Sequence, residues 1–463
     1  MFNALTFIQR RQLLKKKIKT GILLFLGNDG SAMNYAGNEY RFRQDSTFLY
    51  YFGLAEPGLA ALIDLDTGEE ILFGNDLDLD DIIWMGHLPT LAEKSKKIGL
   101  KYFRPSDQLY PLLTAAIRKG RTIHFLPPYR SEHYLKVNRL LGIQEQAVRN
   151  YISLEFVQAV IAQRSIKSKE EITQIELAHN VTRQMHLTAM RKTRPGIYER
   201  DLAGEIEGLA LAAGSTISFP VILSIRGEIL HNHHHDNRLK AGQLIVNDSG
   251  AETATGYAAD ITRTFPVGGK FSTLQAGIYN LVLKAQLDAI RAIRPGRKYL
   301  DIHLRCSRII ASGLKDLQLM RGDINEVVAC GAHALFFPHG LGHMLGLDVH
   351  DMENLGEDYV GYDAKIKRSE QFGLAYLRLA RKLEPGFVLT VEPGIYFIPT
   401  LIEKWEAEKK YDNFINYSQI KKYLHFGGIR IEDNVVVTNQ GCRVLGKPIP
   451  KSVEEVENIV GKF

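Results

Sequence analysis

Acidic side chains stand in stretches of the sequence that are otherwise apolar, and this placement points to metal chemistry. Asp248 ends the apolar run LIVND, and Asp260 lies within a second run, residues 257–267. The small, turn-rich segment GAETATG between them predicts a β-hairpin. A turn centred on Ala254 would place Asp248 opposite Asp260 on one face of the sheet. Two buried carboxylates so close together repel each other unless a cation lies between them. The alternative is an exposed hairpin that carries two incidental acids.

Two further acids occupy similar settings. Glu392 ends the strand-like run FVLTVE, and Glu432 lies inside the run IRIEDNVVV. Arg430 comes two residues before Glu432, so a strand would direct both side chains to the same face. A carboxylate surrounded by isoleucine and valine is hard to explain as solvated surface. These positions therefore add two acids to the predicted metal site.

Histidines supply the remaining ligand chemistry. The stretch FFPHGLGHMLGLDVHD, residues 336–351, contains His339, His343 and His350. One interpretation is a histidine-containing turn before a buried strand; the other is that one imidazole of HGLGH joins the four acids. Four carboxylates and one nitrogen suit Mn²⁺, and also Co²⁺, Fe²⁺ or Zn²⁺. Because four carboxylates neutralise two dications, we predict two divalent metal ions about 3.5–4 Å apart, an arrangement that activates a water molecule as a nucleophile.

Short apolar runs alternate with helical stretches in the N-terminal third of the chain. The runs GILLFLG, GLAALIDLD, EEILFGN and RTIHFLP predict strands. The segments 91–97 and 110–119 predict helices between them. Alternation of this kind indicates a mixed α/β layer domain.

A long amphipathic helix marks a change in the pattern. Ser168 and Glu171 form a predicted capping box at its start, and Pro195 with Gly196 ends it. The polar segment IKSKEE precedes the helix, so we predict one domain over residues 1–165 and a second over residues 166–463. The further elements predicted in the second domain are helices over 199–213 and 273–293, strands at GQLIVNDSG, GYAADITRTFPV, GFVLTVEPGIYFI and GIRIEDNVVV, and surface loops or helices over 353–372 and 403–423.

Composition limits the class of protein. The 463 residues are 45% hydrophobic and 24% charged, the balance of a soluble globular chain. The net charge of +6 is scattered, without the basic stripe and interleaved aromatics that indicate nucleic-acid binding. The apolar segment Ile22–Leu26 is shorter than a signal peptide requires, and no run approaches the length of a membrane span. The three cysteines form no CxxC pair. We expect a cytoplasmic protein with no membrane or nucleic-acid partner.

The order of the motifs resembles that of a known family. DSG…DITRTFP, HGLGHMLGLDVHD, LTVEPGIY and GIRIED resemble the metallopeptidases related to methionine aminopeptidase, aminopeptidase P and prolidase, which have the pita-bread fold. The segment YRFRQDSTFLYYFGLAEPG resembles the N-terminal domain of aminopeptidase P and prolidase. The resemblance implies an α/β (α+β) protein with an N-terminal mixed α/β domain and a C-terminal pita-bread domain. It also implies an enzyme that removes the N-terminal residue from Xaa-Pro peptides.

The resemblance assigns roles to individual residues. The implied metal ligands are Asp248, Asp260, His343, Glu392 and Glu432. The implied substrate-handling histidines are His231, His339 and His350. His339 and His350 would donate hydrogen bonds to the substrate carbonyl and the tetrahedral intermediate. Glu392 would carry the proton from the bridging water to the leaving amine. Arg430 would orient Glu432 or bind a substrate carboxylate.

The sequence departs from the family pattern at two places. Asp248 and Asp260 are one residue farther apart than is usual, which predicts an extra residue in the turn, absorbed as a β-bulge. The stretch HNHHHDN also carries three histidines beyond His231. We expect these to be exposed or to lie behind the ligands rather than to bind metal; they are His233, His234 and His235.

The connection between His350 and Glu392 bears on substrate length. It contains FGLAYLRLARKLEPG, and eukaryotic-type prolidases have a very similar segment whose arginine falls on Arg378. A guanidinium there would bind the free C-terminal carboxylate of a dipeptide. The alternative is a charge on a surface helix, paired with a nearby glutamate. We favour a prolidase-like Xaa-Pro dipeptidase, with a Xaa-Pro aminopeptidase that acts on longer peptides as the alternative.

The quaternary structure and a non-enzymatic class also follow from the resemblance. Trp84 resembles a tryptophan that reaches the site of a neighbouring subunit in relatives, which implies a homodimer or a larger oligomer such as a tetramer. Some proteins with this fold have lost the metal and act as binding modules for peptides. All five ligand positions are filled here, so a metal-dependent peptidase is favoured over a non-catalytic peptide-binding protein.

Overall fold

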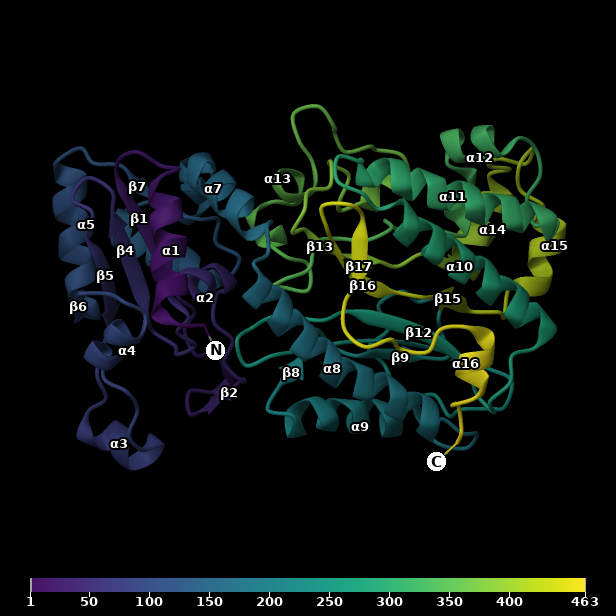
Figure 1. The fold of residues 1–463 in the computed structure, drawn as a ribbon, viewed down its shortest axis with the longest axis horizontal. Helices are drawn as coiled ribbons and strands as arrows, with labels where there is room; N and C mark the ends of the chain where they lie inside the picture. Colours follow the sequence, from purple (N-terminus) through teal and green to yellow (C-terminus); the bar gives the residue numbers. More distant parts are fainter. Residues whose placement is uncertain (1, 463) are drawn as a thin grey trace. The chain divides into compact units, whose positions relative to one another are not determined.

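The computed structural model describes residues 2–462 and contains two compact units (Figure 1). The first unit extends to Arg164 and includes Glu353–Gly356; the second comprises Ser165–Met352 and the chain from Glu357 onward. Each unit combines helices with strands, as the sequence predicts. Among residues 2–462, no helix has the length and apolarity needed to cross a lipid bilayer.

The first unit is built on a five-stranded mixed sheet with the order β6-β5-β4-β1-β7. The strands of this sheet are β1 (Ile22–Leu26), β4 (Ala60–Asp64), β5 (Glu70–Gly74), β6 (Tyr102–Pro105) and β7 (Ile123–His124). A separate pair of strands is formed by β2 (Ala32–Tyr35) and β3 (Asn38–Glu39). The helices of the first unit are α1 (Ala4–Lys15), α2 (Ser46–Phe52), α3 (Leu79–Met85), α4 (Leu91–Lys97), α5 (Leu109–Arg118), α6 (Ser131–Leu141) and α7 (Leu154–Arg164). The four predicted strands and the two predicted helices of this region are present.

Helices cover both faces of this sheet because the buried strands alternate their side chains. Ile22 and Leu24 of β1 belong to a core that includes Leu113 of α5. Phe25 points to the other face, where its ring packs edge-on against Phe52 at 5.1 Å. A strand with two apolar faces requires a helical layer on each side, and GILLFLG is such a strand.

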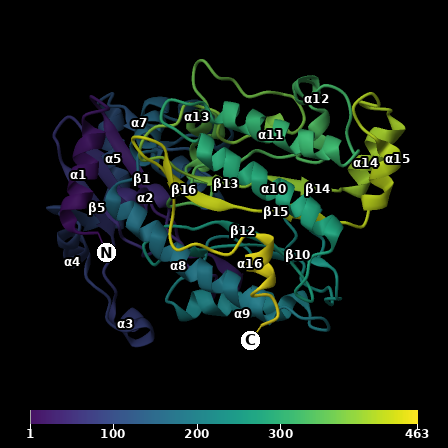
Figure 2. The ribbon, with the colours of Figure 1, turned by 45° about the vertical axis from the view of Figure 1, so that its right-hand side comes forward.

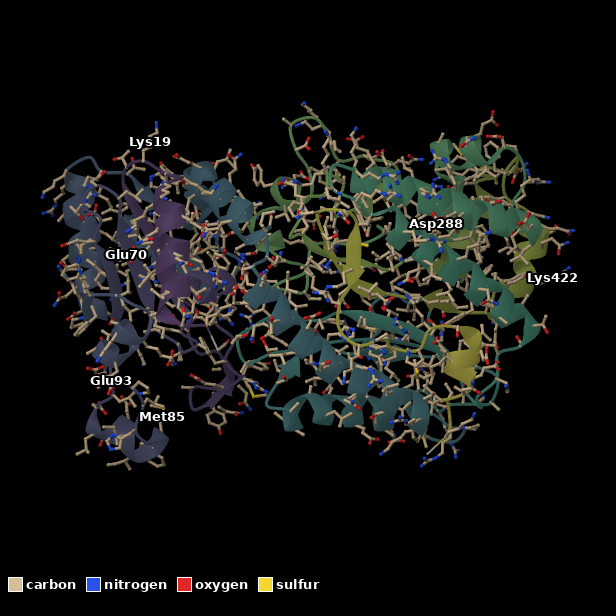
Figure 3. All side chains as sticks on the ribbon, in the orientation of Figure 1. Lys19, Glu70, Met85, Glu93, Asp288 and Lys422 are labelled. Carbon is tan, nitrogen blue, oxygen red and sulfur yellow. The ribbon has the colours of Figure 1, made fainter. Side chains whose placement is uncertain are left out.

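Helix α3 differs from the other helices of this unit because none of its side chains is buried. Trp84 is 86% exposed, and Ile83 beside it is also exposed. Met85, labelled in Figure 3, is exposed as well. Trp84 does not line the pocket described below. Its predicted contact with a neighbouring subunit stays a prediction.

The second unit carries four antiparallel sheets between helical layers. Its strands are β8 (Thr216–Ile217), β9 (Ile222–Ser224), β10 (Leu244–Ser249), β11 (Ala251–Glu252), β12 (Ile261–Pro266), β13 (Val388–Val391), β14 (Gly394–Tyr396), β15 (Gly428–Arg430), β16 (Asp433–Val437) and β17 (Cys442–Val444). Its helices are α8 (Lys169–Lys192), α9 (Glu199–Ala212), α10 (Thr273–Ala292), α11 (Tyr299–Asp316), α12 (Ile324–Cys330), α13 (Glu357–Gly361), α14 (Pro399–Ala407), α15 (Tyr417–Ile420) and α16 (Val453–Glu457).

Two pairs of helices enclose these strands. Helices α8 and α9 pack against β9 and β10, and α10 packs against β13 and β15 with α11 beside it. Figures 1 and 2 both show the two helix pairs on opposite sides of the strands. The predicted capping box of Ser168 and Glu171 begins α8, which confirms that helix. Helix α11 was not predicted from the sequence.

The hairpin that carries Asp248 and Asp260 forms, but in another register. β10 and β12 pair Asp248 with Thr262, so the prediction that the two aspartates oppose each other is wrong. Asp260 lies two residues from Thr262, and side chains two apart on a strand share a face. Both carboxylates therefore still point into the same pocket.

The predicted β-bulge forms at the turn. The bridge between Glu252 and Ala258 continues the register of β10 and β12 without a shift. The extra residue lies in the turn, where the amide of Gly256 (φ 89°) donates to the Thr253 carbonyl and the Thr253 amide donates to the Tyr257 carbonyl, the pattern of a G1 bulge. Glycine adopts this conformation at no steric cost, so the turn forms around it rather than around Ala254.

Two predicted strands are interrupted at their acids. Glu392 and Pro393 separate β13 from β14, and Glu432 follows β15 directly before β16. Proline lacks the amide hydrogen that a ladder needs, so pairing stops there. The register is nevertheless the same on both sides of the breaks, since Val391 pairs with Asp433 and Gly394 with Arg430.

Gly250 provides a stability test of the hairpin. A Cβ atom there would lie 1.8 Å from the carbonyl oxygen of Ala259. We expect Gly250→Ala to lower the free energy of unfolding by about 3 kcal/mol, because the strands must separate to admit the methyl group. Urea denaturation followed by circular dichroism measures this change. Gly204→Ala in α9 is the control, since nothing lies within 4 Å of its added Cβ. Equal stability of Gly250→Ala and wild type would contradict the packing described here.

Candidate metal centre

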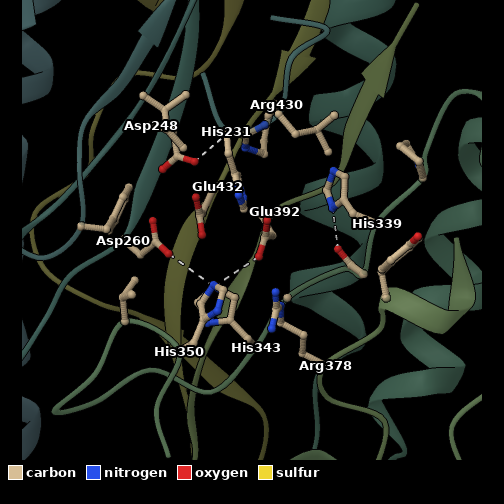
Figure 4. A pocket seen from close by; sticks show the side chains of 18 of the residues that line it. His231, Asp248, Asp260, His339, His343, His350, Arg378, Glu392, Arg430 and Glu432 are labelled. Carbon is tan, nitrogen blue, oxygen red and sulfur yellow. Dashed lines mark hydrogen bonds and ion pairs between the residues drawn. The ribbon is translucent and has the colours of Figure 1, made fainter. Parts of the chain in front are cut away.

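A pocket of ≈ 580 Å³ opens in the second unit. Every site residue predicted for this unit lines it: His231, Asp248, Asp260, His339, His343, His350, Arg378, Glu392, Arg430 and Glu432. Figure 4 shows the carboxylates and His343 converging from separate strands and one loop. The pocket therefore joins predicted site residues that are far apart in the sequence, from His231 to Glu432.

Three of these side chains lie within reach of a single ion. One ligand atom each from Asp260, His343 and Glu432 lies within 4.8 Å of the others. His343 Nε2 is 3.3 Å from Asp260 Oδ2 and 3.4 Å from Glu392 Oε1. His343 Nδ1 is 3.0 Å from the Met344 carbonyl oxygen. An Nδ1–H that donates to this oxygen leaves the Nε2 lone pair free to bind a metal.

Burial and mutual repulsion control the charge of the acids. Removal from water, followed by the charge of Asp248, raises the pKa of Asp260 well above its ordinary value. Removal from water, followed by the charge of Asp260, does the same to the pKa of Glu432. Burial also raises the pKa of Glu392, although nearby His343 opposes the shift. The protein alone thus disfavours the fully ionised cluster, and a cation would favour it.

The donor set fits divalent metal ions. Three buried carboxylate oxygens, Asp248 Oδ1, Asp260 Oδ1 and Glu432 Oε1, have no hydrogen-bond partner among the described residues. Buried polar atoms are normally paired, so oxygens left over in one pocket indicate an absent partner. Carboxylate oxygens with one imidazole nitrogen are suited to Mn²⁺ and to other first-row dications.

A buried arginine holds one side of the cluster. Arg430 donates to Asp248 Oδ2 at 2.6 Å and to the Thr262 hydroxyl at 3.1 Å. Thr262 in turn donates to Glu432 Oε2 at 2.6 Å. Arg430 also donates to the Tyr396 hydroxyl at 2.9 Å. These contacts occupy the guanidinium within the pocket wall, the geometry of a residue that orients ligands.

Thr390 holds the other side of the cluster. Its hydroxyl donates to Glu392 Oε1 and accepts from the backbone amide of His343, both at 3.1 Å. The loop of His343 can approach β13 so closely only because Gly342 has no side chain: a Cβ there would lie 2.2 Å from the Thr390 carbonyl oxygen. Glycine next to the histidine is therefore a packing requirement of the site.

The histidines differ in their surroundings. His339 Nε2 is 2.9 Å from the Tyr396 hydroxyl and Nδ1 is 2.8 Å from the Gly340 carbonyl oxygen. Burial lowers the pKa of His339 to about 3, so the ring is neutral. The His350 ring lies 4.1 Å from that of His343. A hydrogen bond from His339 to a substrate would have to replace the one to Tyr396.

The additional histidines lie around His231. His233 is exposed and lines the pocket, and His234 is exposed. His235 Nδ1 is 3.1 Å from the Leu223 carbonyl oxygen. None of the three belongs to the cluster of potential metal ligands found among the described residues.

Arg378 reaches the pocket from a segment that is not helical. A 3-10 turn spans Leu374–Tyr376, Leu377 after it is extended and Arg378 lies at a bend, so the alternative of a surface helix is wrong. The amides of Ala380 and Arg381 donate to the Gly361 carbonyl, which competes with helical hydrogen bonds. The expected pairing with a glutamate is present, since Arg378 Nη1 donates to Glu357 Oε1 at 2.9 Å.

Hydroxyl and amide side chains that support the acids were missed in the sequence. They are Thr262, Thr390, Tyr396 and Asn434, and all four are buried. Asn434, for example, accepts from the Asp260 backbone amide at 3.0 Å. Each of them lies two or four residues from one of the acids in an apolar run. This spacing could have indicated them, because a buried hydroxyl or amide needs a hydrogen-bond partner.

The buried carboxylate cluster in a two-sided α/β unit defines a candidate metallohydrolase. The chain matches the model of metallopeptidase family M24 over residues 173–439 and that of the aminopeptidase P N-terminal domain over residues 7–124. This protein belongs to metallopeptidase family M24. The predicted family, the pita-bread fold with its N-terminal domain and the dependence on a divalent metal are confirmed at this level.

Relatives with this arrangement span both substrate classes. The chain is 33% identical to the Xaa-Pro aminopeptidase of Escherichia coli over 98% of this chain and 97% of the relative. It is 32% identical to the Xaa-Pro dipeptidase of Homo sapiens over 90% and 84%, respectively. Zinc-substituted Escherichia coli aminopeptidase P in complex with product superposes with a TM-score of 0.80 at 31% identity, covering 99% and 98% of the two chains.

The metal content tests the cluster. We expect Asp260→Asn to lose bound metal, because the amide replaces a charged oxygen that is shared with His343 and Glu432. Inductively coupled plasma mass spectrometry after metal loading and gel filtration measures this loss, and circular dichroism checks that the fold is retained. Asp236→Asn is the control, since this side chain is 84% exposed and lies outside the pocket. Full metal content in Asp260→Asn would rule out the site.

Proposed function

We propose that the protein is a metal-dependent Xaa-Pro peptidase that removes the residue before a proline. The observation that carries the proposal is the buried acid–imidazole cluster with its unpaired oxygens. The relatives on both sides of the family, named Xaa-Pro aminopeptidase and Xaa-Pro dipeptidase, support proline as the recognised residue. We assign the catalytic domain to residues 166–463 and the N-terminal domain to residues 1–165.

Two divalent ions, with Mn²⁺ the first choice and Co²⁺, Fe²⁺ or Zn²⁺ as alternatives, complete the proposed site. The proposed ligands are Asp248, Asp260, His343, Glu392 and Glu432. Four acids match the charge of two dications, and Arg430 compensates Asp248 from the opposite side. When bound, the ions supply Lewis-acid activation of a water molecule.

The residues around the cluster have separate roles in proton transfer, stabilisation of the scissile carbonyl and positioning of the substrate. Glu392, whose pKa is raised by burial, takes a proton from the attacking water and passes it to the leaving proline nitrogen. His350 donates a hydrogen bond to the oxygen of the scissile carbonyl, where negative charge develops. His339 becomes a second donor when its hydrogen moves from Nδ1, which faces the Gly340 carbonyl, to Nε2. His231 lies on the same pocket wall and positions the substrate. Arg430 keeps Asp248 in place.

The other end of the pocket favours a short substrate. Arg378 lines it together with the apolar side chains Phe372, Tyr376 and Leu401. A proline ring suits the apolar wall, and the guanidinium suits a terminal carboxylate. These residues belong to the segments 357–378 and 398–407 of the second unit. We therefore favour the dipeptidase, with the aminopeptidase as the second candidate because the Escherichia coli relative is equally similar.

Assembly and compartment complete the proposal. The exposed apolar face of α3, with Trp84 at its centre, supports a homodimer or tetramer. Three free cysteines support a reducing, cytoplasmic environment.

Bond selectivity tests the activity. We expect the manganese-loaded enzyme to hydrolyse Ala-Pro and to leave Ala-Ala and Met-Ala intact, because only proline fills the apolar wall. Product analysis by liquid chromatography measures cleavage, with Asp260→Asn as the inactive control. Rapid turnover of Met-Ala without action on Xaa-Pro bonds would contradict the proposal.

Arg378 tests the choice between the two candidates. We expect Arg378→Ala to raise KM for Ala-Pro on the order of 10²-fold, since a lost charge-assisted pair costs ~2–3 kcal/mol. Cleavage of Ala-Pro-Ala, whose carboxylate lies farther along, should change much less. Arg381→Ala is the matched control, because Arg381 pairs with Glu384 and does not line the pocket. If wild type cleaves both peptides equally and Arg378→Ala alters neither, the enzyme is an aminopeptidase.

A further inference from the structure

A carboxylate of the protein already occupies the guanidinium that the proposed function assigns to the substrate. Glu357 Oε1 accepts from Arg378 Nη1 at 2.9 Å, and Glu357 Oε2 accepts from Arg368 Nη2 at 2.8 Å. All three side chains line the pocket. Glu357 thus lies between two guanidinium groups, each of which binds one of its oxygens.

Arg368 is anchored independently of Glu357. Its Nε donates to Asp358 Oδ1 at 2.8 Å, and Nη1 donates to the Ala375 carbonyl oxygen at 3.0 Å. Its guanidinium lies over the Tyr362 ring, 4.8 Å from the centroid. Because these contacts do not involve Glu357, Arg368 keeps its place when that glutamate moves or changes.

The backbone fixes the distance between Glu357 and Arg378. Both belong to segments that meet at Gly361, where an added Cβ would lie 1.7 Å from the Arg378 carbonyl oxygen. The Ala380 amide also donates to the Gly361 carbonyl at 2.8 Å. Helix α13 begins at Glu357 and ends at Gly361, so this contact holds the glutamate beside Arg378.

The ion pairs are accessible enough to be exchanged. The side chains of Arg378 and Glu357 are 34% and 37% exposed. Ion pairs at this exposure contribute little net stability, since water screens them.

We propose that Glu357 is a specificity-determining residue that acts as an internal competitor of the substrate's C-terminal carboxylate. A dipeptide must share or displace the contact between Glu357 and Arg378, so the glutamate weakens binding of substrates with a terminal carboxylate at this position. Substrates without that charge are unaffected. The inference rests on the proposed role of Arg378, and it concerns binding rather than the chemical step.

Replacement of the competing charge tests the proposal. Glu357→Gln keeps the size of the side chain and one hydrogen bond to Arg378, but it removes the negative charge. We expect KM for Ala-Pro to fall about five-fold, the upper range for an exposed ion pair, with kcat unchanged. KM for Ala-Pro-amide, which lacks the terminal charge, should stay at the wild-type value. A role confined to stability would move neither KM selectively.

Asp358→Asn is the matched control. Asp358 lies next to Glu357 on α13 and pairs with Arg368, but it makes no contact with Arg378 among the described residues. This variant should leave KM for Ala-Pro near the wild-type value. An equal fall in both variants would assign the effect to general electrostatics and overturn the proposal.

The double variant separates this inference from the proposed function. In an Arg378→Ala background, Glu357→Gln should no longer lower KM for Ala-Pro, because the contested guanidinium is absent. If Arg378→Ala raises KM but Glu357→Gln raises KM or leaves it unchanged, Glu357 only positions Arg378 and the internal-competitor proposal is wrong. If Arg378→Ala itself has no effect, the proposed recognition of the terminal carboxylate fails, and this inference fails with it.

Discussion

Repulsion among four buried carboxylates is the constraint on which the rest of the second unit depends. The acids occupy a largely buried pocket, and the Arg430 guanidinium and the imidazole of His343 lie close to their oxygens. Such an arrangement is costly in a metal-free protein. The surrounding network limits the cost by holding one oxygen of each acid: the Arg430 guanidinium, the threonine hydroxyls and the His343 imidazole each contact one of the four carboxylates. Folding thereby preorganises the ligands, so that binding of a cation needs little rearrangement of their side chains.

The acids were predictable from the sequence because a charged residue in an apolar run has few explanations. The same logic failed where geometry depends on a neighbour far along the chain. The hairpin register followed from Gly256, whose φ of 89° relocates the turn. The surface helix considered as an alternative for Arg378 did not form because the amides of Ala380 and Arg381 donate to the Gly361 carbonyl, a contact that the local sequence pattern does not indicate. Thr262 and Thr390 were not predicted as site residues because threonine is common in strands. Their role becomes clear only from the hydrogen bonds that their hydroxyls donate to Glu432 and Glu392.

Chemistry and recognition are carried by different parts of the second unit. The acids and His343 stand on or beside short strands, which the flanking helices hold rigidly. The residues around Arg378 belong to connections that have little hydrophobic periodicity and were expected to be surface segments. Their side chains nevertheless form one wall of the pocket. Because catalysis and substrate recognition lie on different segments, substitutions in the connecting segments can change substrate preference without moving the metal ligands. It also agrees with the near-equal likeness of this chain to relatives named as aminopeptidase and as dipeptidase.

The turn between β10 and β12 has a consequence for how such sites are recognised in other sequences. An additional residue at its tip changes the count between Asp248 and Asp260 while the ladder keeps one register from end to end. A search pattern with a fixed interval after Asp248 would stop one residue short, at Ala259, and would score this chain as lacking a ligand. A pattern anchored on the ladder partner Thr262, counted back by two, finds the carboxylate whatever the length of the turn. Proteins dismissed as degenerate on spacing alone are therefore worth aligning again by strand register.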